Sequence, residues 1–150
     1  MENLRDLLKK KGSDVWVIDG DKTVLDAIRM MAEKEVGSLV VVKAGKPVGI
    51  FTEHHYTREV FLKGRSSPTT LIREVMGTPV VCAPLEYTIP ESMAVMTKKR
   101  IRHLPVVDNE QLVGIVSMGD LVESQIHDQE LVIASLTEYI HGCPPTCGVQ

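Results

Sequence analysis

The sequence is poor in cysteine and long apolar runs, and each shortage excludes a class of protein. Three cysteines in 150 residues are too few for the disulfide framework that stabilises small secreted domains. Apolar runs such as 38–42 stay far below the roughly 20 residues that span a bilayer. The N-terminal stretch 1–6 is charged and lacks the apolar core of a signal peptide. These shortages predict a cytoplasmic protein without membrane contact.

Neither sign of charge dominates, which argues against another group of functions. The 17 basic and 20 acidic residues give a net charge of -3, and aromatic residues make up only 4%. No basic patch alternates with aromatic side chains, so nucleic-acid binding has no support in the sequence. A hydrophobic content of 43% and a charged content of 25% are typical of a folded globular chain, and this length suits one compact domain.

The most informative pattern that is present is an internal repeat. Residues 15–55 align without a gap on residues 80–120, which lie 65 positions further on. Ten aligned pairs are identical, among them Gly49/Gly114 and Ile50/Ile115, and most other apolar positions stay apolar. A chain that builds one fold twice usually packs the copies face to face. We therefore expect the functional site at the junction between them.

Hydrophobic periodicity predicts the same order of elements in each copy: helix, strand, helix, strand, strand, helix. The fold class is accordingly α/β (α+β), with two small three-stranded sheets, helices on one face of each, packed with pseudo-two-fold symmetry. Expected boundaries are 1–66 for the first repeat with its leading helix, 67–128 for the second, and 129–150 for a C-terminal helix and flexible tail. The helices are expected over 2–11, 23–37, 52–63, 71–76, 88–100, 117–127 and 131–140, and the strands over 15–18, 39–42, 48–51, 80–83, 103–107 and 112–116.

The repeated segments resemble the CBS domain, the regulatory repeat named after cystathionine β-synthase. In the second copy the resemblance rests on Leu104–Val107 followed, after a hairpin, by Gly114–Leu121; in the first copy it rests on Gly37–Val42 and Gly49–Thr52. CBS domains occur in pairs called Bateman modules. The resemblance implies clefts between the copies that bind adenosine ligands such as AMP, ADP, ATP, NAD(H) or S-adenosylmethionine, with AMP, ADP or ATP favoured here and no further cofactor required.

The family's nucleotide motif, Gly-hydrophobic-hydrophobic-Ser/Thr-x-x-Asp, is complete only in the second copy. There Ser117 begins a helix whose N–H groups favour phosphate, and the resemblance implies that Asp120 accepts the ribose hydroxyls. The alternative is ordinary helix capping by these two residues. The first copy keeps Thr52 but has His55 at the acidic position, so its site is expected to be degenerate. The sequence thus predicts one good adenosine site per chain, built on Asp120.

Further contacts follow from the same resemblance. Arg102 and His103 match positions that can face phosphate, whereas Lys98 and Lys99 fit a cationic helix end equally well. An adenine base needs an apolar slot. The expected walls are Gly114, Ile115, Val80, Val81, Cys82 and Ala83 for the second-copy site, and Val15, Trp16, Val17 and Ile50 for the first, with Trp16 open to packing or base stacking.

Nothing in the sequence predicts catalysis or a metal site. The adjacent His54 and His55 leave a helix about 100° apart and share a metal poorly. The function predicted is a nucleotide sensor that signals to an unidentified partner in trans and forms a homodimer through Thr52–Lys63 and Ser117–His127. Two alternatives stay open: a ligand-free dimerisation scaffold, and a redox or metal role for Cys143 and Cys147 in the tail.

Overall fold

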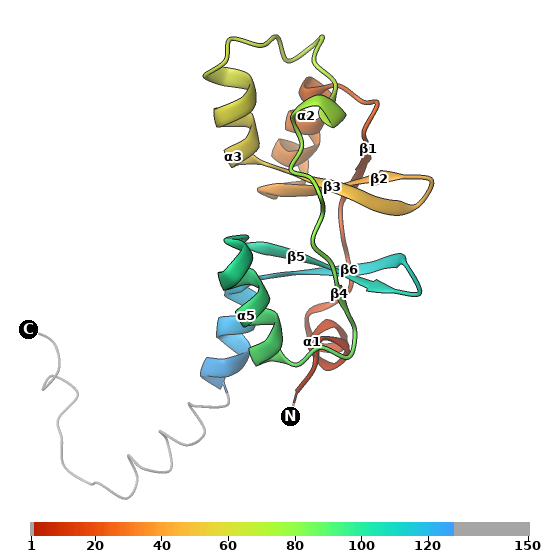
Figure 1. Ribbon diagram of the computed structural model, residues 1–150, viewed down its shortest axis with the longest axis vertical. Helices are drawn as coiled ribbons and strands as arrows, with labels where there is room; N and C mark the ends of the chain where they lie inside the picture. Colours follow the sequence, from red (N-terminus) through yellow and green to blue (C-terminus); the bar gives the residue numbers. More distant parts are fainter. Residues whose placement is uncertain (1, 128–150) are drawn as a thin grey trace, which may run out of the picture.

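The computed structural model describes residues 2–127. Within this range two similar halves lie one above the other, with their sheets turned toward the middle and their helices toward the ends (Figure 1). The helix predicted over 131–140 and the tail with Cys143 and Cys147 lie outside the described residues. Among residues 2–127, no helix has both the length and the apolar character needed to cross a membrane.

Each half contains a three-stranded mixed sheet, and the two sheets share the same register. The first strand runs parallel to the second, which pairs antiparallel with the third through a hairpin. Bulges fall at the aligned positions Val41/Val42 and Val106/Val107. The strands are β1 (Val17–Asp19), β2 (Ser38–Lys43) and β3 (Lys46–Thr52), then β4 (Ala83–Pro84), β5 (His103–Asp108) and β6 (Gln111–Ser117). The predicted fold of two tandem repeats is confirmed.

The helices also repeat. They are α1 (Leu4–Lys11), α2 (Val24–Lys34), α3 (Glu53–His55) continuing as the π-helix η1 (Tyr56–Phe61), α4 (Ile72–Val75) and α5 (Ile89–Lys99), followed by a helix over 118–127. Thr23 and Thr88 cap α2 and α5 by accepting hydrogen bonds from the backbone N–H groups of Asp26 and Glu91.

Several predicted boundaries were wrong, among them the first strand, which covers Val17–Asp19 rather than 15–18. Helix α2 ends at Lys34 rather than at Gly37, because Glu35 adopts a left-handed conformation with φ of 55°, and Arg100 ends α5 in the same way. The strand predicted over 80–83 is reduced to Ala83–Pro84. Residues 77–81 instead run along the junction, where the N–H and C=O groups of Gly77 pair with Ile50 of the first half.

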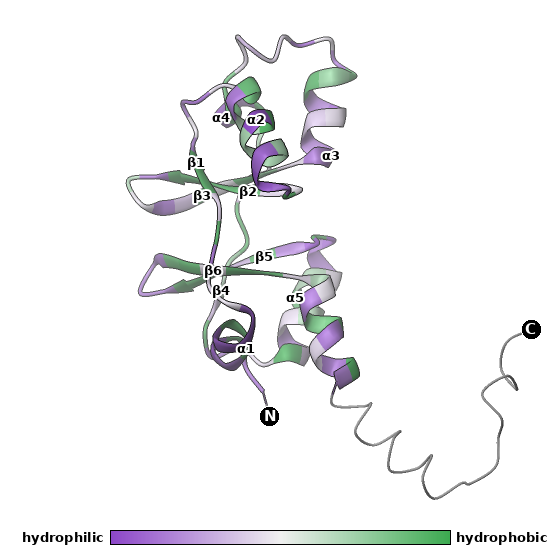
Figure 2. Cartoon of the chain, turned by 180° about the vertical axis from the view of Figure 1, so that it is seen from behind, coloured by the Kyte–Doolittle hydropathy of each residue, from purple (hydrophilic) through white to green (hydrophobic). Residues whose placement is uncertain are grey.

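Each leading helix packs in the core of the other repeat and not in the core of the repeat that follows it. Helix α1 precedes the first repeat, yet Leu4, Leu7 and Leu8 pack in the core of the second half. Helix α4 precedes the second repeat, yet Ile72 and Val75 pack in the core of the first. Figure 1 shows this exchange, with α1 beside β4 and α5, and α4 close to α2. Figure 2 shows that the strands facing the middle are the most hydrophobic parts of both halves.

Candidate functional site

A cavity of about 910 Å³ opens where the two halves meet, within the range of roughly 300–1,000 Å³ that is usual for small-molecule sites. The first half supplies the start of α3 and part of β3; the second supplies residues 77–81, the end of α5 and the start of β5. Its apolar walls are Ile50, Pro79, Val80, Val81, Ile101 and Pro105. The cavity therefore has an apolar part that an apolar group can contact.

Basic side chains make up much of the remaining wall. They are His54, His55, Arg58, Lys99, Arg100, Arg102 and His103, while Glu53 is the one acidic residue among the described residues that line the cavity. The cations Arg58, Lys99, Arg100 and Arg102 give this concave site a positive field that attracts anions. Arginine guanidinium groups in particular suit phosphate, because their fork of N–H donors matches two oxygens at once.

His55 takes the structural role of a capping carboxylate. Its Nδ1 accepts a hydrogen bond from the backbone N–H of Thr52 at 3.1 Å, and the Thr52 hydroxyl accepts one from the His55 N–H at 3.3 Å. When Nδ1 is an acceptor, the neutral ring carries its proton on Nε2. That edge of the ring lies against Gly77, where a Cβ would stand 2.8 Å from Nε2. Glycine at residue 77 thus makes room for the imidazole.

Both histidines of the cavity that show a pKa shift are kept neutral by burial. Burial lowers the pKa of His55, and Glu59 acts in the opposite direction. Burial likewise lowers the pKa of His103, opposed by Asp120. Desolvation disfavours the charged form of an imidazole. A bound anion would reverse this preference, because it stabilises the imidazolium.

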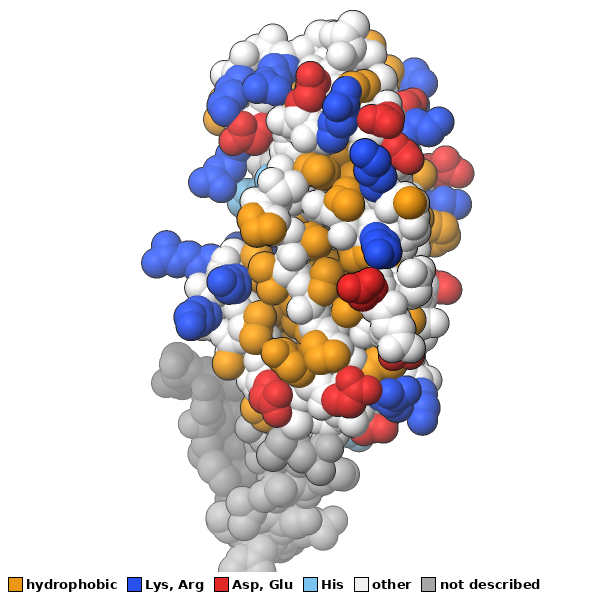
Figure 3. Space-filling model, turned by 45° about the vertical axis from the view of Figure 1, so that its right-hand side comes forward, with side chains coloured by type: hydrophobic (Ala, Val, Ile, Leu, Met, Phe, Trp, Pro, Cys, Tyr) orange, Lys and Arg blue, Asp and Glu red, His pale blue; other side chains and the backbone are white. Residues whose placement is uncertain are grey.

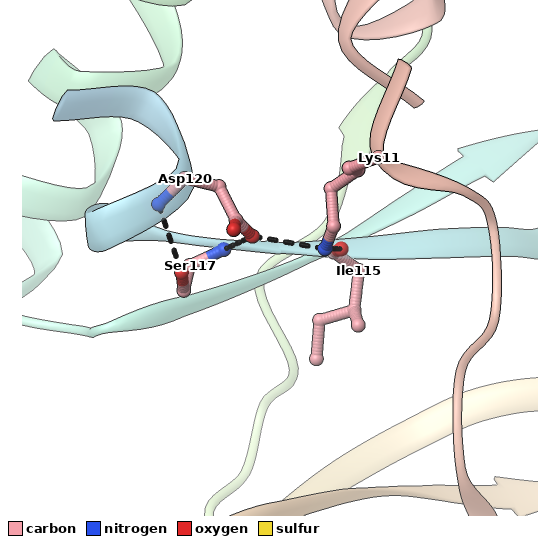
Figure 4. Close-up of polar contacts among 4 residues, drawn as sticks. All are labelled: Lys11, Ile115, Ser117 and Asp120. Carbon is pink, nitrogen blue, oxygen red and sulfur yellow. Dashed lines mark hydrogen bonds and ion pairs between the residues drawn. The ribbon is translucent and has the colours of Figure 1, made fainter. Parts of the chain in front are cut away.

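Ser117 and Asp120 of the complete motif cap a helix in the same way as Thr52 and His55, but a lysine lies beside the aspartate. Asp120 Oδ2 accepts from the Ser117 N–H at 2.8 Å, and Ser117 Oγ accepts from the Asp120 N–H at 3.0 Å. Lys11 Nζ forms an ion pair with Oδ2 at 2.9 Å and donates to the Ile115 carbonyl at 2.8 Å (Figure 4). Burial opposes ionisation of Asp120, but the hydrogen bonds from Lys11 and Ser117 outweigh it and lower the pKa.

The structure brings together part of the residues that the sequence singled out. Those that line the cavity are Ile50, Thr52, His55, Val80, Val81, Lys99, Arg102 and His103. Not among its lining residues are Ser117, Asp120, Gly114, Ile115, Cys82 and Val17.

The sequence-based grouping therefore differs from the geometry. Val81 was assigned to the Asp120 site, but it shares the cavity with His55, because residues 77–81 cross to the first half. The surface of Gly114 is covered by Leu8, since a Cβ at residue 114 would lie 2.8 Å from Leu8 Cδ1. Burial raises the pKa of the Cys82 thiol. Val17 lies on β1, opposite Val40, and is 40% exposed.

Sequence reasoning missed three residues that shape these two places. Arg58 lines the cavity one helical turn beyond His54, a spacing that places both side chains on one helix face. Gly77 admits the His55 ring, and its position before Thr78-Pro79 reads in sequence only as a helix stop. Lys11 reaches Asp120 across 109 residues of sequence, a contact that no local pattern announces.

Comparison with known proteins identifies the fold. The family model described as CBS domain matches the chain twice, over residues 4–61 and 72–127. The chain belongs to the CBS-domain family. CBS domains cover both halves described above, and the fold is that of a CBS pair.

Several relatives with CBS domains span most of the chain. The CBS domain-containing protein CBSX3, mitochondrial, of Arabidopsis thaliana is 35% identical over 93% of this chain and 72% of its own length. The CBS domain-containing protein YhcV of Bacillus subtilis is 30% identical over 86% of this chain and 91% of its own. A solved structure of a protein with CBS domains from Burkholderia ambifaria is 42% identical, with a TM-score of 0.80, covering 85% of this chain and 96% of its own.

Similarity to enzymes is confined to part of those enzymes. Inosine-5'-monophosphate dehydrogenase of Methanocaldococcus jannaschii is 33% identical over 77% of this chain, but that match covers only 23% of the dehydrogenase. CBSX3 and YhcV, which are matched over most of their own length, carry CBS domains in their names. CBS-pair proteins generally bind adenosine ligands for regulation.

Proposed function

We propose that this CBS pair is a regulatory sensor of an adenine nucleotide, bound in the cavity that Thr52, His55, Val81, Arg102 and His103 line. The observation that carries the proposal is the division of the cavity wall into an apolar part and a basic part. The apolar slot suits the adenine, and the basic groups suit the phosphates. The protein is a binding module in this proposal, not an enzyme.

The charge of the cavity also ranks the ligands. ATP and ADP carry more negative charge than AMP, and S-adenosylmethionine carries a cationic sulfonium group. A wall with four cationic side chains, Arg58, Lys99, Arg100 and Arg102, and with Glu53 as its described acidic member favours the polyphosphates. We therefore expect affinity in the order ATP, ADP, AMP, with S-adenosylmethionine bound weakly or not at all. His55 in place of aspartate removes the carboxylate that would read the ribose hydroxyls, so phosphate contacts dominate recognition.

A route from the cavity to the outside is available through the backbone. The carbonyl of Arg102 accepts a hydrogen bond from the N–H of Met118, the first residue of helix 118–127, at 2.9 Å. In the first half the carbonyl of Gly37 accepts from the Glu53 N–H at 3.2 Å, at the start of α3. A ligand that favours one position of these segments would shift the two helices. A partner protein that contacts the helices would receive the signal in trans.

The test is calorimetric titration of the protein with ATP, ADP, AMP, NADH and S-adenosylmethionine. We expect saturable binding of ATP and at least a tenfold loss of affinity in Arg102→Ala, about 1.4 kcal/mol. Lys98→Ala is the matched control, because Lys98 is an exposed cation beside the cavity but not among its lining residues. If no nucleotide binds to the folded protein, a ligand-free scaffold becomes the better explanation.

A second proposal concerns assembly, and exposed apolar side chains support it. Phe61 and Leu62 at the end of η1 are 68% and 71% exposed, and Val122 and Ile126 on helix 118–127 are 37% and 47% exposed. Large apolar groups that are this exposed on the corresponding helices of the two halves are typical of a protein interface. We propose that these helices form a homodimer, so that a ligand-induced helix shift changes the arrangement of two chains. A hexameric CBS-CP12 protein from cyanobacteria, 25% identical with a TM-score of 0.71, is an assembly of the same fold.

A further inference from the structure

The two leading helices begin alike but end differently. Asn3 forms a bridge with Thr88, and Leu71 forms the corresponding bridge with Thr23. The start of α1 thus aligns with the start of α4 at a separation of 68 residues, whereas the repeats that follow align at 65. Helix α1 has 8 residues and α4 has 4. The first leading helix therefore carries an additional turn, which ends in Lys9, Lys10 and Lys11.

The additional turn changes which group donates a hydrogen bond to the third strand of each sheet, β3 or β6. After the shorter α4, the chain itself pairs with β3, because the Gly77 N–H donates to the Ile50 carbonyl at 2.8 Å. Ile115 is the aligned residue of β6, and its carbonyl accepts from Lys11 Nζ instead, also at 2.8 Å. A side-chain ammonium group takes the place of a backbone N–H, and it brings a positive charge to this position.

The same ammonium group also binds one oxygen of the carboxylate of the complete motif. Lys11 Nζ lies 2.9 Å from Asp120 Oδ2, and this oxygen already accepts from the Ser117 N–H. The side chains of Lys11 and Asp120 are only 28% and 26% exposed. Ion pairs that are partly shielded from water are screened less by salt than exposed pairs. In contrast, Lys46 and Glu110 are 58% and 80% exposed.

We propose that Lys11 acts as an internal latch, which binds Asp120 and the Ile115 carbonyl and so keeps the Asp120 position closed to a nucleoside. Recognition of a ribose diol needs free acceptor capacity on a carboxylate, and Lys11 competes for that capacity. This inference rests on the proposed function, because it explains why one nucleotide per chain is expected at the His55 cavity and none at the motif with the intact aspartate. A ligand enters the second position only by displacing Lys11.

Removal of the charge tests the latch. The variant Lys11→Met keeps the length of the side chain and loses both the ion pair and the hydrogen bond. We expect AMP titrations to show one binding event per chain in the unmodified protein and two in the variant. The double variant Lys11→Met/Asp120→Ala should return to one. Lys9→Met is the control for the charge change, since Lys9 lies in the same additional turn and is exposed.

Each result decides the question. An additional binding event in Lys11→Met that disappears in the double variant supports the latch, even if the His55 cavity binds nothing and the proposed function fails. An unchanged stoichiometry in folded Lys11→Met overturns it. Binding in the unmodified protein that is lost in Lys11→Met also overturns it, because Lys11 would then contact the ligand. If Lys11→Met does not fold, Lys11→Gln keeps a donor for the Ile115 carbonyl without the charge, and the same outcomes apply.

Discussion

Gly77 and His55 show how one missing side chain shapes the cavity. A Cβ at residue 77 would stand 2.8 Å from His55 Nε2 and 2.9 Å from Cε1, closer than real atoms of this kind approach. The ring is held at its other edge by the Thr52 N–H. It cannot retreat without losing that hydrogen bond, so glycine at residue 77 and histidine at residue 55 depend on each other.

We predict that Gly77→Ala displaces the His55 ring and weakens ATP binding at least tenfold. The crowding should also lower the free energy of unfolding by about 1–3 kcal/mol, as overpacking does. Calorimetry and urea unfolding measure the two effects. Gly119→Ala is the control, because a Cβ at residue 119 meets only Ser117 Oγ at an ordinary 3.5 Å. Unchanged ATP affinity in Gly77→Ala would show that the position of His55 does not matter for binding.

The buried histidines make both stability and affinity depend on pH. Burial lowers the pKa of His55 and of His103, while Glu59 and Asp120 oppose the shift. Unfolded histidine takes up a proton near its ordinary pKa of 6.5, before the folded form does. The contribution of these two histidines to the free energy of unfolding is therefore fully present above pH 6.5 and is lost as the pH drops from there toward the lowered pKa.

We predict the opposite sign for ligand binding: ATP affinity rises as the pH falls from 8 to 6. Bound phosphate favours the imidazolium, so binding takes up protons. Titrations in two buffers of different ionisation enthalpy measure this uptake directly. In His55→Gln the uptake should shrink, and equal uptake in both proteins would place the coupled proton elsewhere.

Helix α1 stabilises the second half of the molecule, although it precedes the first repeat in the sequence. Leu4 is fully buried in the core of the second half, and Ile72 of α4 is fully buried in the core of the first. We predict that Leu4→Ala costs about 2–5 kcal/mol, the usual range for a large buried aliphatic residue, and speeds hydrogen exchange mainly in β5 and β6. Ile72→Ala is the matched variant and should speed exchange mainly in β2 and β3. If both variants showed the same pattern of hydrogen exchange, the result would contradict the packing of each leading helix in the other half.

Local sequence patterns predicted most of the elements, and the failures have physical causes. The hairpins β2–β3 and β5–β6 follow from short runs rich in apolar and β-branched residues on either side of polar turns. The strand over 80–83 was overpredicted because an apolar run does not reveal which neighbour it will pair with. Residues 77–81 run along the junction, where Gly77 forms backbone hydrogen bonds with Ile50. Only Ala83–Pro84 pair with β5. Whether a leading helix packs forward or backward is likewise invisible to periodicity.

The candidate site was predictable in kind rather than in arrangement. The repeat and its motif located Thr52, His55, Arg102 and His103, which do line one cavity. The assignment of Val81 to Asp120 followed sequence order, but each cavity wall combines residues from both repeats. Lys11 lies outside the aligned segments and is joined to Asp120 only through the folded chain.

At the scale of the whole molecule, the exposed apolar side chains of η1 and helix 118–127 predict self-association. We expect Phe61→Glu combined with Val122→Glu to give a monomer in analytical ultracentrifugation, because the charges would be buried at the interface. Val17→Glu is the control, since Val17 is an exposed apolar residue on β1, away from these helices. A dimer that survives the double change would place the contact on another face, such as the apolar surface that crosses both halves in Figure 3.

Because each leading helix packs in the core of the other repeat, the packing determines the smallest fragment of the chain that can fold independently. A single repeat cut out at the linker near residue 66 would carry a helix shaped for its neighbour and would lack the one that covers its own core. Two such fragments, mixed, could rebuild the native arrangement only by recognising each other, as the parts of a split protein do. Neither half is therefore expected to stay folded when the other half is deleted from the chain.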